Sequence, residues 1–158
     1  MGNDLETLSI HLRLVTPDDS NDILTWRNDP LTRMNSETSH EISPQEHDQW
    51  LQKALQDPAR FLLMAMTKEG KKIGFIHFKE ENGKTTVSLN IAPQERGKKY
   101  SAHIIHEAIE KYQLERAHQP IIARIKKDNA VSTKSFLKAG FKLVEAGDQY
   151  DIFQWGEV

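Results

Sequence analysis

Residues suited to holding phosphate groups surround the glycine in 96-RGKKYSAHIIHEAIEKY-112. The preceding segment, 84-KTTVSLNIAP-93, alternates like a β-strand, so Gly97 lies where a strand turns into a helix. Free backbone amides at the start of a helix point outward and carry about half a positive charge, which suits a pyrophosphate. The three basic residues beside Gly97 would add to that charge. Taken alone, the segment fits either a phosphate site or a basic, solvated helix start.

A second group of residues lies downstream, in 129-NAVSTKSFLKAGF-141. The spacing of its asparagine, serine, phenylalanine and Gly-Phe pair resembles motif B of the GNAT acetyltransferases. Residues 96–101 resemble motif A of that family, Arg/Gln-x-x-Gly-x-Gly/Ala, although Lys99 and Ser101 replace the two usual small residues. Because the two motifs stand in the family's order and the resemblance covers nearly the whole chain, it favours the phosphate site.

The resemblance implies that the chain binds acetyl-CoA as a co-substrate and uses no metal ion. Backbone amides would bind the diphosphate, while Lys99 either crowds it, points away from it or joins it. The residues expected at the coenzyme are Ile91, Arg96, Gly97, Lys98, Lys99, Tyr100, Ser101, Asn129, Ser132 and Phe136.

The chemistry implied by the resemblance is direct transfer of an acetyl group to a primary amine. Backbone amides of the strand over residues 87–92 would polarise the thioester carbonyl. An ammonium group has no lone pair, so a base or a water chain must first remove a proton. His47 and Glu41 are candidates for that role, as are Ser88 and Asn90 through water.

The proton donor to the leaving thiolate is a separate question. Many GNAT relatives place a tyrosine where this chain has Phe136, which has no proton to give. The open candidates are Ser132, Ser135, Tyr100, Tyr150 and solvent, and we take Ser132 with His47 and Glu41 as the candidate catalytic set.

The N-terminal third contains the series Trp26-Arg27-Asn28, Arg33-x-Asn35-Ser36 and Ile42-Ser43-x-x-Glu46-His47-x-x-Trp50. This series resembles the GNAT branch that acetylates nucleotide-linked amino sugars, a branch close to the ribosomal-protein N-terminal acetyltransferases. Arginines can bind a diphosphate or carboxylate with two hydrogen bonds, and tryptophans can stack on a base or sugar. The residues expected at the substrate are Trp26, Arg27, Asn28, Arg33, Ser88 and Asn90. Acetylation of protein N-termini or of another small amine is one alternative, and a catalytically silent module that binds coenzyme A is another.

Local patterns predict the elements that position these residues. Alternation, short apolar runs and the Asn82-Gly83 turn signal predict strands near 8–15, 60–67, 72–79, 84–91, 120–127, 141–145 and 149–155. Cap residues and 3.6-residue periodicity predict helices near 16–28, 43–56, 98–112 and 129–139, with an ordered loop over 30–42. The expected fold is a single α/β (α+β) GNAT domain over residues 1–158, with a mixed, mostly antiparallel sheet of about seven strands and about four helices.

The composition excludes several classes of function. The 158 residues include no cysteine, which removes disulfides, thiolate metal sites and a cysteine nucleophile. A net charge of -2 argues against a nucleic-acid surface, and no apolar run reaches the ~20 residues of a membrane span. We therefore expect a cytoplasmic enzyme of small molecules, without nucleic-acid or membrane partners. Relatives of this type often pair, which leaves open a homodimer.

Overall fold

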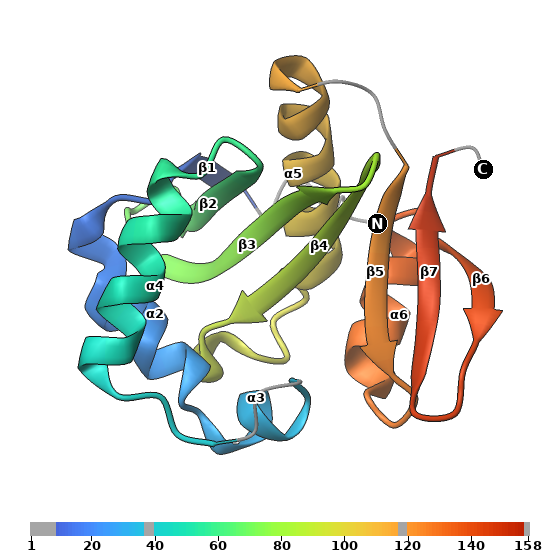
Figure 1. The fold of residues 1–158 in the computed structure, drawn as a ribbon, viewed down its shortest axis with the longest axis horizontal. Coiled ribbons are helices and arrows are strands. Elements are labelled where there is room, and N and C mark those ends of the chain that lie inside the picture. The colour runs from blue at the N-terminus through green and yellow to red at the C-terminus, as the bar shows by residue number, and fades with distance from the viewer. Residues whose placement is uncertain (1–8, 37–39, 117–119, 157–158) are drawn as a thin grey trace.

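The computed structural model of the chain describes residues 9–36, 40–116 and 120–156. Its seven strands form one sheet in the order β1-β2-β3-β4-β5-β7-β6 (Figure 1). The strands are β1 (Ile10–Leu14), β2 (Arg60–Thr67), β3 (Lys72–Glu81), β4 (Lys84–Ile91), β5 (Ile121–Lys126), β6 (Lys142–Ala146) and β7 (Tyr150–Trp155). The helices are α2 (Ser20–Arg27), α3 (Pro30–Met34), α4 (Pro44–Gln56), α5 (Ser101–Glu115) and α6 (Ala130–Lys138), with short 3-10 helices η1 (Pro17–Asp19) and η2 (Pro93–Glu95).

Helices cover both faces of the sheet. Helices α5 and α6 bury the larger core, in which Ile105 and Phe136 pack against alternate residues of β2 to β5 and β7. Helices α2 and α4 bury a smaller core on the other face, where Trp26 and Leu51 meet Phe75. On that second face, the ribbon of β5 and β7 has no helix over it (Figure 1). The second face therefore has a covered half and an open half.

Strands β4 and β5 separate soon after they begin. They are the one parallel pair among the described strands, and they are paired at Thr85 with Ile121 and at Thr86 with Ile122. Beyond these pairs the two strands diverge toward their C-terminal ends (Figure 1). We call the region between residues 87–91 of β4 and 123–126 of β5 the β4–β5 split.

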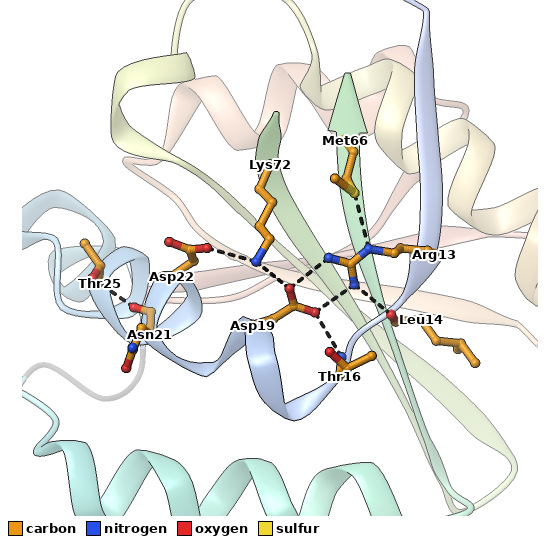
Figure 2. A network of polar contacts seen from close by, with 9 residues as sticks. All are labelled: Arg13, Leu14, Thr16, Asp19, Asn21, Asp22, Thr25, Met66 and Lys72. Carbon is orange, nitrogen blue, oxygen red and sulfur yellow. Dashed lines mark hydrogen bonds and ion pairs between the residues drawn. The ribbon is translucent and has the colours of Figure 1, made fainter. Parts of the chain in front are cut away.

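A buried carboxylate fixes the start of α2 to the sheet. Asp19 is 1% exposed and receives two hydrogen bonds from Arg13, at 2.8 and 2.9 Å, and an ion pair from Lys72 at 2.7 Å (Figure 2). Burial alone would raise the pKa of Asp19, but the hydrogen bonds from Arg13 and Lys72 hold it well below its ordinary value. The network ties η1 to β1 and β3.

The predicted fold class is confirmed, and so are the local signals behind it. Asn82 and Gly83 both have positive φ, +55° and +77°, as a two-residue type I′ hairpin turn requires. The hydroxyl of Ser43 accepts from the amide of Glu46 at 3.1 Å and caps α4. Gly140, with φ +106°, ends α6, and the Phe141 amide donates to the Phe136 carbonyl at 3.0 Å.

Two local predictions were wrong. Residues 30–34, expected in a loop, form α3, whose start has an Asp29 cap bonded to the Thr32 amide at 3.2 Å and Pro30 at the first helical position. The described part of the chain thus has five α-helices. Helix α5 begins at Ser101, not near residue 98, because the backbone takes positive φ at Gly97 and Lys99 before it can coil.

Candidate active site

Two backbone amides of β4 point into the split. The Thr85 amide donates to the Pro120 carbonyl at 3.1 Å, toward β5, whereas the Ala92 amide donates to the Ile73 carbonyl at 2.8 Å, toward β3. Amides alternate between the two edges of a strand, so every odd-numbered residue of β4 presents its amide to β5. The ladder with β5 stops at the pair Thr86–Ile122. The amides of Leu89 and Ile91 therefore lie beyond it and are available to a group that enters the split.

A cradle for phosphates lies at the open end of the split. Gly97 and Lys99 have φ of +78° and +68°, and the first hydrogen bond of the α5 turn runs from the Ile104 amide to the Tyr100 carbonyl at 2.9 Å. The amides of residues 101–103 precede that bond and have no acceptor within the helix. The left-handed φ at residue 99 also explains why the family prefers glycine there, since a Cβ costs about 1–2 kcal/mol in this conformation. The cradle fits a diphosphate bound by amides.

Two of the three expected cations of the cradle are already paired. Lys98 forms an ion pair with Glu95 at 3.1 Å. Glu95 is only 3% exposed and forms a second ion pair with Lys71, also at 3.1 Å. Burial would raise the pKa of Glu95, but Lys98 and Lys71 lower it overall. Arg96 contacts Asp29, at the N-terminus of α3. Lys99 is exposed, so the amides and Lys99 carry the positive potential of the cradle.

The motif B residues have structural roles in α6. The Asn129 side chain accepts from the Ser132 amide at 3.2 Å and caps the helix. Phe136 is 3% exposed and meets the edge of Phe141, with ring centroids 5.0 Å apart. Asn129 is therefore explained by its role as a helix cap, and Phe136 by its packing between α6 and the sheet.

A cluster of rings and cations lies on the α2/α4 face, beside the split. The Arg27 guanidinium stacks 4.4 Å from the Trp50 ring centre and contacts His47 Nδ1 at 3.0 Å. The edge of His77 meets Trp50 with ring centroids 5.7 Å apart, and Arg60 contacts His77 Nε2 at 3.2 Å. We call these five residues the His77 cluster.

The cluster includes a residue that sequence analysis missed. His77 of β3 pairs across the hairpin with Ser88 of β4, and Phe75 pairs with Asn90. The four side chains therefore share one face of the sheet. The signal was present, because a two-residue turn at Asn82-Gly83 fixes every partner across the hairpin, and counting outward from it pairs residue 77 with residue 88.

The residues predicted at the substrate separate into two groups. Trp26 is 4% exposed in the smaller core, and the Asn28 side chain makes two hydrogen bonds to the backbone of Ile42, at 2.8 and 2.7 Å. Arg33 donates to the Asn28 carbonyl at 3.2 Å. These three residues hold the segments around α3 together. Ser88 is exposed and Asn90 half-buried on the face beside the split, and Arg27 belongs to the His77 cluster.

The candidate catalytic residues are not brought together. His47 is fully buried, and its Nδ1 faces Arg27. Burial and then the Arg27 charge lower the pKa of His47, so its ring is neutral at pH 7. Ser132 lies in the first turn of α6, which packs on the opposite face of the sheet, and Glu41 is exposed before α4. His47 and Ser132 thus lie over opposite faces of the sheet, and the catalytic set stays a prediction.

His77 is held in one neutral form. A guanidinium only donates hydrogen bonds, so Nε2 of His77 accepts from Arg60 and Nδ1 carries the hydrogen. Burial, followed by the charges of Arg60 and Lys79, lowers the pKa of His77 to about 4. Its Nδ1 hydrogen is therefore a permanent donor at neutral pH, on the face that carries Ser88.

Protonation of His77 should make the fold sensitive to acid. The unfolded chain takes up this proton near pH 6.5 and the folded chain only near pH 4, so stability is complete above pH 6.5 and lost as pH falls toward 4. The loss from this residue is roughly 3 kcal/mol, at 1.36 kcal/mol for each pKa unit. Urea unfolding at pH 7.0, 5.5 and 4.5 should show a shallower fall for His77→Gln than for the wild type. Identical pH slopes would contradict this.

Comparisons with known proteins show the family of the chain and support its fold. The model of the acetyltransferase (GNAT) domain family matches residues 9–142. A spermidine N-acetyltransferase from Vibrio cholerae, in complex with CoA and spermine, superposes with a TM-score of 0.79 at 18% identity, over 92% of each chain. An aminoglycoside acetyltransferase in complex with coenzyme A superposes with a TM-score of 0.77 at 18% identity, over 92% of this chain and 93% of the other. A domain from Methanocaldococcus jannaschii superposes with a TM-score of 0.81 at 21% identity, over 93% of this chain and 97% of the other. No curated protein matches the sequence.

The described residues contain no group of three metal-binding side chains and no helix long and apolar enough to span a membrane. The family match covers most of the chain, and the split sheet with its amide cradle supplies a site of the kind that coenzyme A requires. The chain therefore belongs to the GNAT acetyltransferase domain family.

Proposed function

We propose that this acetyl-CoA-dependent N-acetyltransferase acts on a small primary amine that also carries an anionic group, with nucleotide-linked amino sugars as the leading class. N-acetyl transfer from acetyl-CoA follows from the family. The choice of acceptor rests on the charges around the split.

Acetyl-CoA supplies the acetyl group and the thiol that leaves. The chain binds its phosphates at the amides before α5, and the Leu89 and Ile91 amides are directed to the thioester carbonyl in the split. The acceptor approaches from the face that carries Ser88 and Asn90. One carbon–nitrogen bond forms and one carbon–sulfur bond breaks, while the amine loses a proton and the sulfur gains one.

Cations on β5 are the observation that carries the choice of acceptor. Ile121, Ala123 and Ile125 point into the α5/α6 core, so Arg124 and Lys126 point to the other face, which is the open one. The Arg124 guanidinium lies 3.7 Å from the Tyr150 ring centre. The Asp29 carboxylate, at the start of α3, is paired with Arg96. The positive charge of Arg124 and Lys126 attracts phosphate or carboxylate groups and repels polycations.

A polycationic amine is the second candidate. The similar structures named above include enzymes that acetylate spermidine and aminoglycosides, and none of the three is described as acting on a nucleotide-linked amino sugar. Carboxylates facing the split would favour such a substrate, and the charge of Arg124 and Lys126 opposes it.

Acceptor turnover tests the proposal. The panel comprises a nucleoside-diphosphate-linked amino sugar, the same amino sugar without its nucleotide, spermidine and an aminoglycoside, with release of the coenzyme A thiol as the readout. We expect the linked sugar to have the highest kcat/KM. Higher kcat/KM for spermidine or the aminoglycoside would contradict the proposal.

Arg124→Gln should then raise KM for the linked sugar by about 10-fold or more, because a charge-assisted hydrogen bond contributes about 1.5–3 kcal/mol. KM for acetyl-CoA should stay within about twofold. Lys142→Gln removes the same charge from an exposed position on β6 and is the matched control. Equal KM values for the two variants would show that Arg124 does not contact the acceptor.

A further inference from the structure

Helix α3 is fastened at both ends by cations from the two sides of the split. At its N-terminus, Arg96 Nη2 contacts the Asp29 carboxylate and donates to the Thr32 hydroxyl at 3.0 Å. At its C-terminus, Lys126 Nζ donates to the Met34 carbonyl at 2.6 Å. Arg96 follows β4, and Lys126 is the last residue of β5. One contact thus comes from the loop that follows β4 and η2, and the other from the end of β5.

The position of α3 follows from the direction of the split. Strands β4 and β5 are parallel and are paired only at their beginnings, so their C-terminal ends are the open end. Both anchors lie at that end, and α3 lies below the diverging strands in Figure 1. Helix α3 is therefore held across the open end of the β4–β5 split.

Arg96 belongs to two structures at once. Its backbone starts the loop that forms the phosphate cradle, while its side chain holds the cap of α3. Burial would raise the pKa of Asp29, but the hydrogen bond from Arg96 lowers it overall, so the carboxylate stays charged. On the other side, the Arg33 side chain of α3 reaches back to the Asn28 carbonyl, next to Arg27 of the His77 cluster.

We propose that Arg96 and Asp29 are positioning residues that couple acetyl-CoA binding to the acceptor side of the site through α3. Coenzyme bound in the cradle orders residues 96–100, and Arg96 then holds α3 more firmly. Helix α3 in turn fixes the part of the site that contacts the amine acceptor. Coupling of this kind is reciprocal, so an acceptor that contacts α3 also tightens acetyl-CoA. The inference rests on acetyl-CoA binding at the cradle and is independent of the acceptor's identity.

Hydrogen exchange of α3 tests the coupling without an acceptor. The Arg33 and Asn35 amides make hydrogen bonds within this turn, to Asp29 and Leu31 at 2.9 and 3.1 Å. In the wild type, saturating acetyl-CoA should slow their exchange severalfold. Asp29→Asn keeps an N-cap side chain that accepts as well as aspartate does, but loses the charge that pairs with Arg96. In this variant acetyl-CoA should bind within about threefold of wild type, and the slowing at Arg33 and Asn35 should disappear.

Asp18→Asn is the control, because it removes one carboxylate from an exposed position in η1 and should exchange like the wild type. Calorimetry on the same samples separates the two possible failures. Saturated binding without slower exchange in the wild type would overturn the coupling and leave the coenzyme site intact. Slowing that survives in Asp29→Asn would overturn the role of the ion pair. No heat of acetyl-CoA binding would overturn the cradle and the coupling together.

Discussion

Gly97→Asp should weaken acetyl-CoA binding by about 100-fold or more. Gly97 lies at φ +78°, and a Cβ built there meets no other atom of the protein within 4 Å. A side chain at residue 97 therefore causes no clash within the described part of the chain. What remains is charge, since a carboxylate would stand beside the diphosphate that the cradle binds. At about 5 Å and an effective dielectric near 20, two like charges repel by about 3 kcal/mol, which corresponds to a factor above 100.

Gly97→Asn separates the charge from the backbone. Asparagine has nearly the shape of aspartate and tolerates left-handed φ equally well, so the two variants share the conformational cost. Calorimetric titration with acetyl-CoA should give a modest loss for Asn and a much larger loss for Asp. The gap should shrink as salt is raised, because screening weakens charge repulsion. Equal dissociation constants for the two variants would mean that the diphosphate does not lie at Gly97.

The sequence predicted those features that depend on neighbours in the chain. The Asn82-Gly83 turn, the Ser43 and Asn129 caps and the glycine after α6 each act within a few residues, and their positions are confirmed. The seven strands also followed from local patterns, either alternation or a short apolar run. Helix α3 was missed although Asp29-Pro30 has the same cap and proline as Ser43-Pro44, because its five residues are too few to show a periodic apolar face.

Contacts between segments that are distant in the chain could not be predicted from neighbouring residues. Arg96 was expected to face phosphates, yet its side chain binds Asp29, 67 residues earlier. Asn28 was expected at the substrate, yet both polar ends of its amide bind Ile42. In each case the residue type allows two partners, and only the folded arrangement decides between them. His77 is different, because hairpin register was sufficient to place it opposite Ser88.

Asp19→Asn should lower the free energy of unfolding by about 2–4 kcal/mol. Removing one member of a buried ion pair costs about 3–5 kcal/mol. The expected loss is somewhat smaller because Arg13 and Lys72 are 32% and 25% exposed and regain water when the charge is lost. For a chain of this length the midpoint of thermal unfolding should fall by roughly 5–12 °C. Asp22→Asn is the matched control, since Asp22 is 51% exposed and pairs with Lys72 alone, and it should cost under about 1 kcal/mol.

The pH dependence identifies the charge as the cause. The pKa of Asp19 is lowered in the folded chain, so its contribution is complete above the ordinary aspartate pKa near 3.8 and is lost only as pH falls below it. The difference between wild type and Asp19→Asn should therefore be constant from pH 7 to 5 and narrow below about 4. A difference that stays constant down to pH 3 would indicate lost packing instead.

The same variant connects stability to the acceptor side of the site. Asp19 fastens η1 to β1 and β3 (Figure 2). Helix α2 continues from η1 to Arg27, which stacks on Trp50 and contacts His47. The phosphate cradle has a further attachment that does not involve Asp19, through Glu95 to Lys71 and Lys98. At a temperature where Asp19→Asn is still folded, loosening of α2 should raise KM for the amine and leave the affinity for acetyl-CoA nearly unchanged. Equal losses on both sides would mean that the two halves of the site respond as one body.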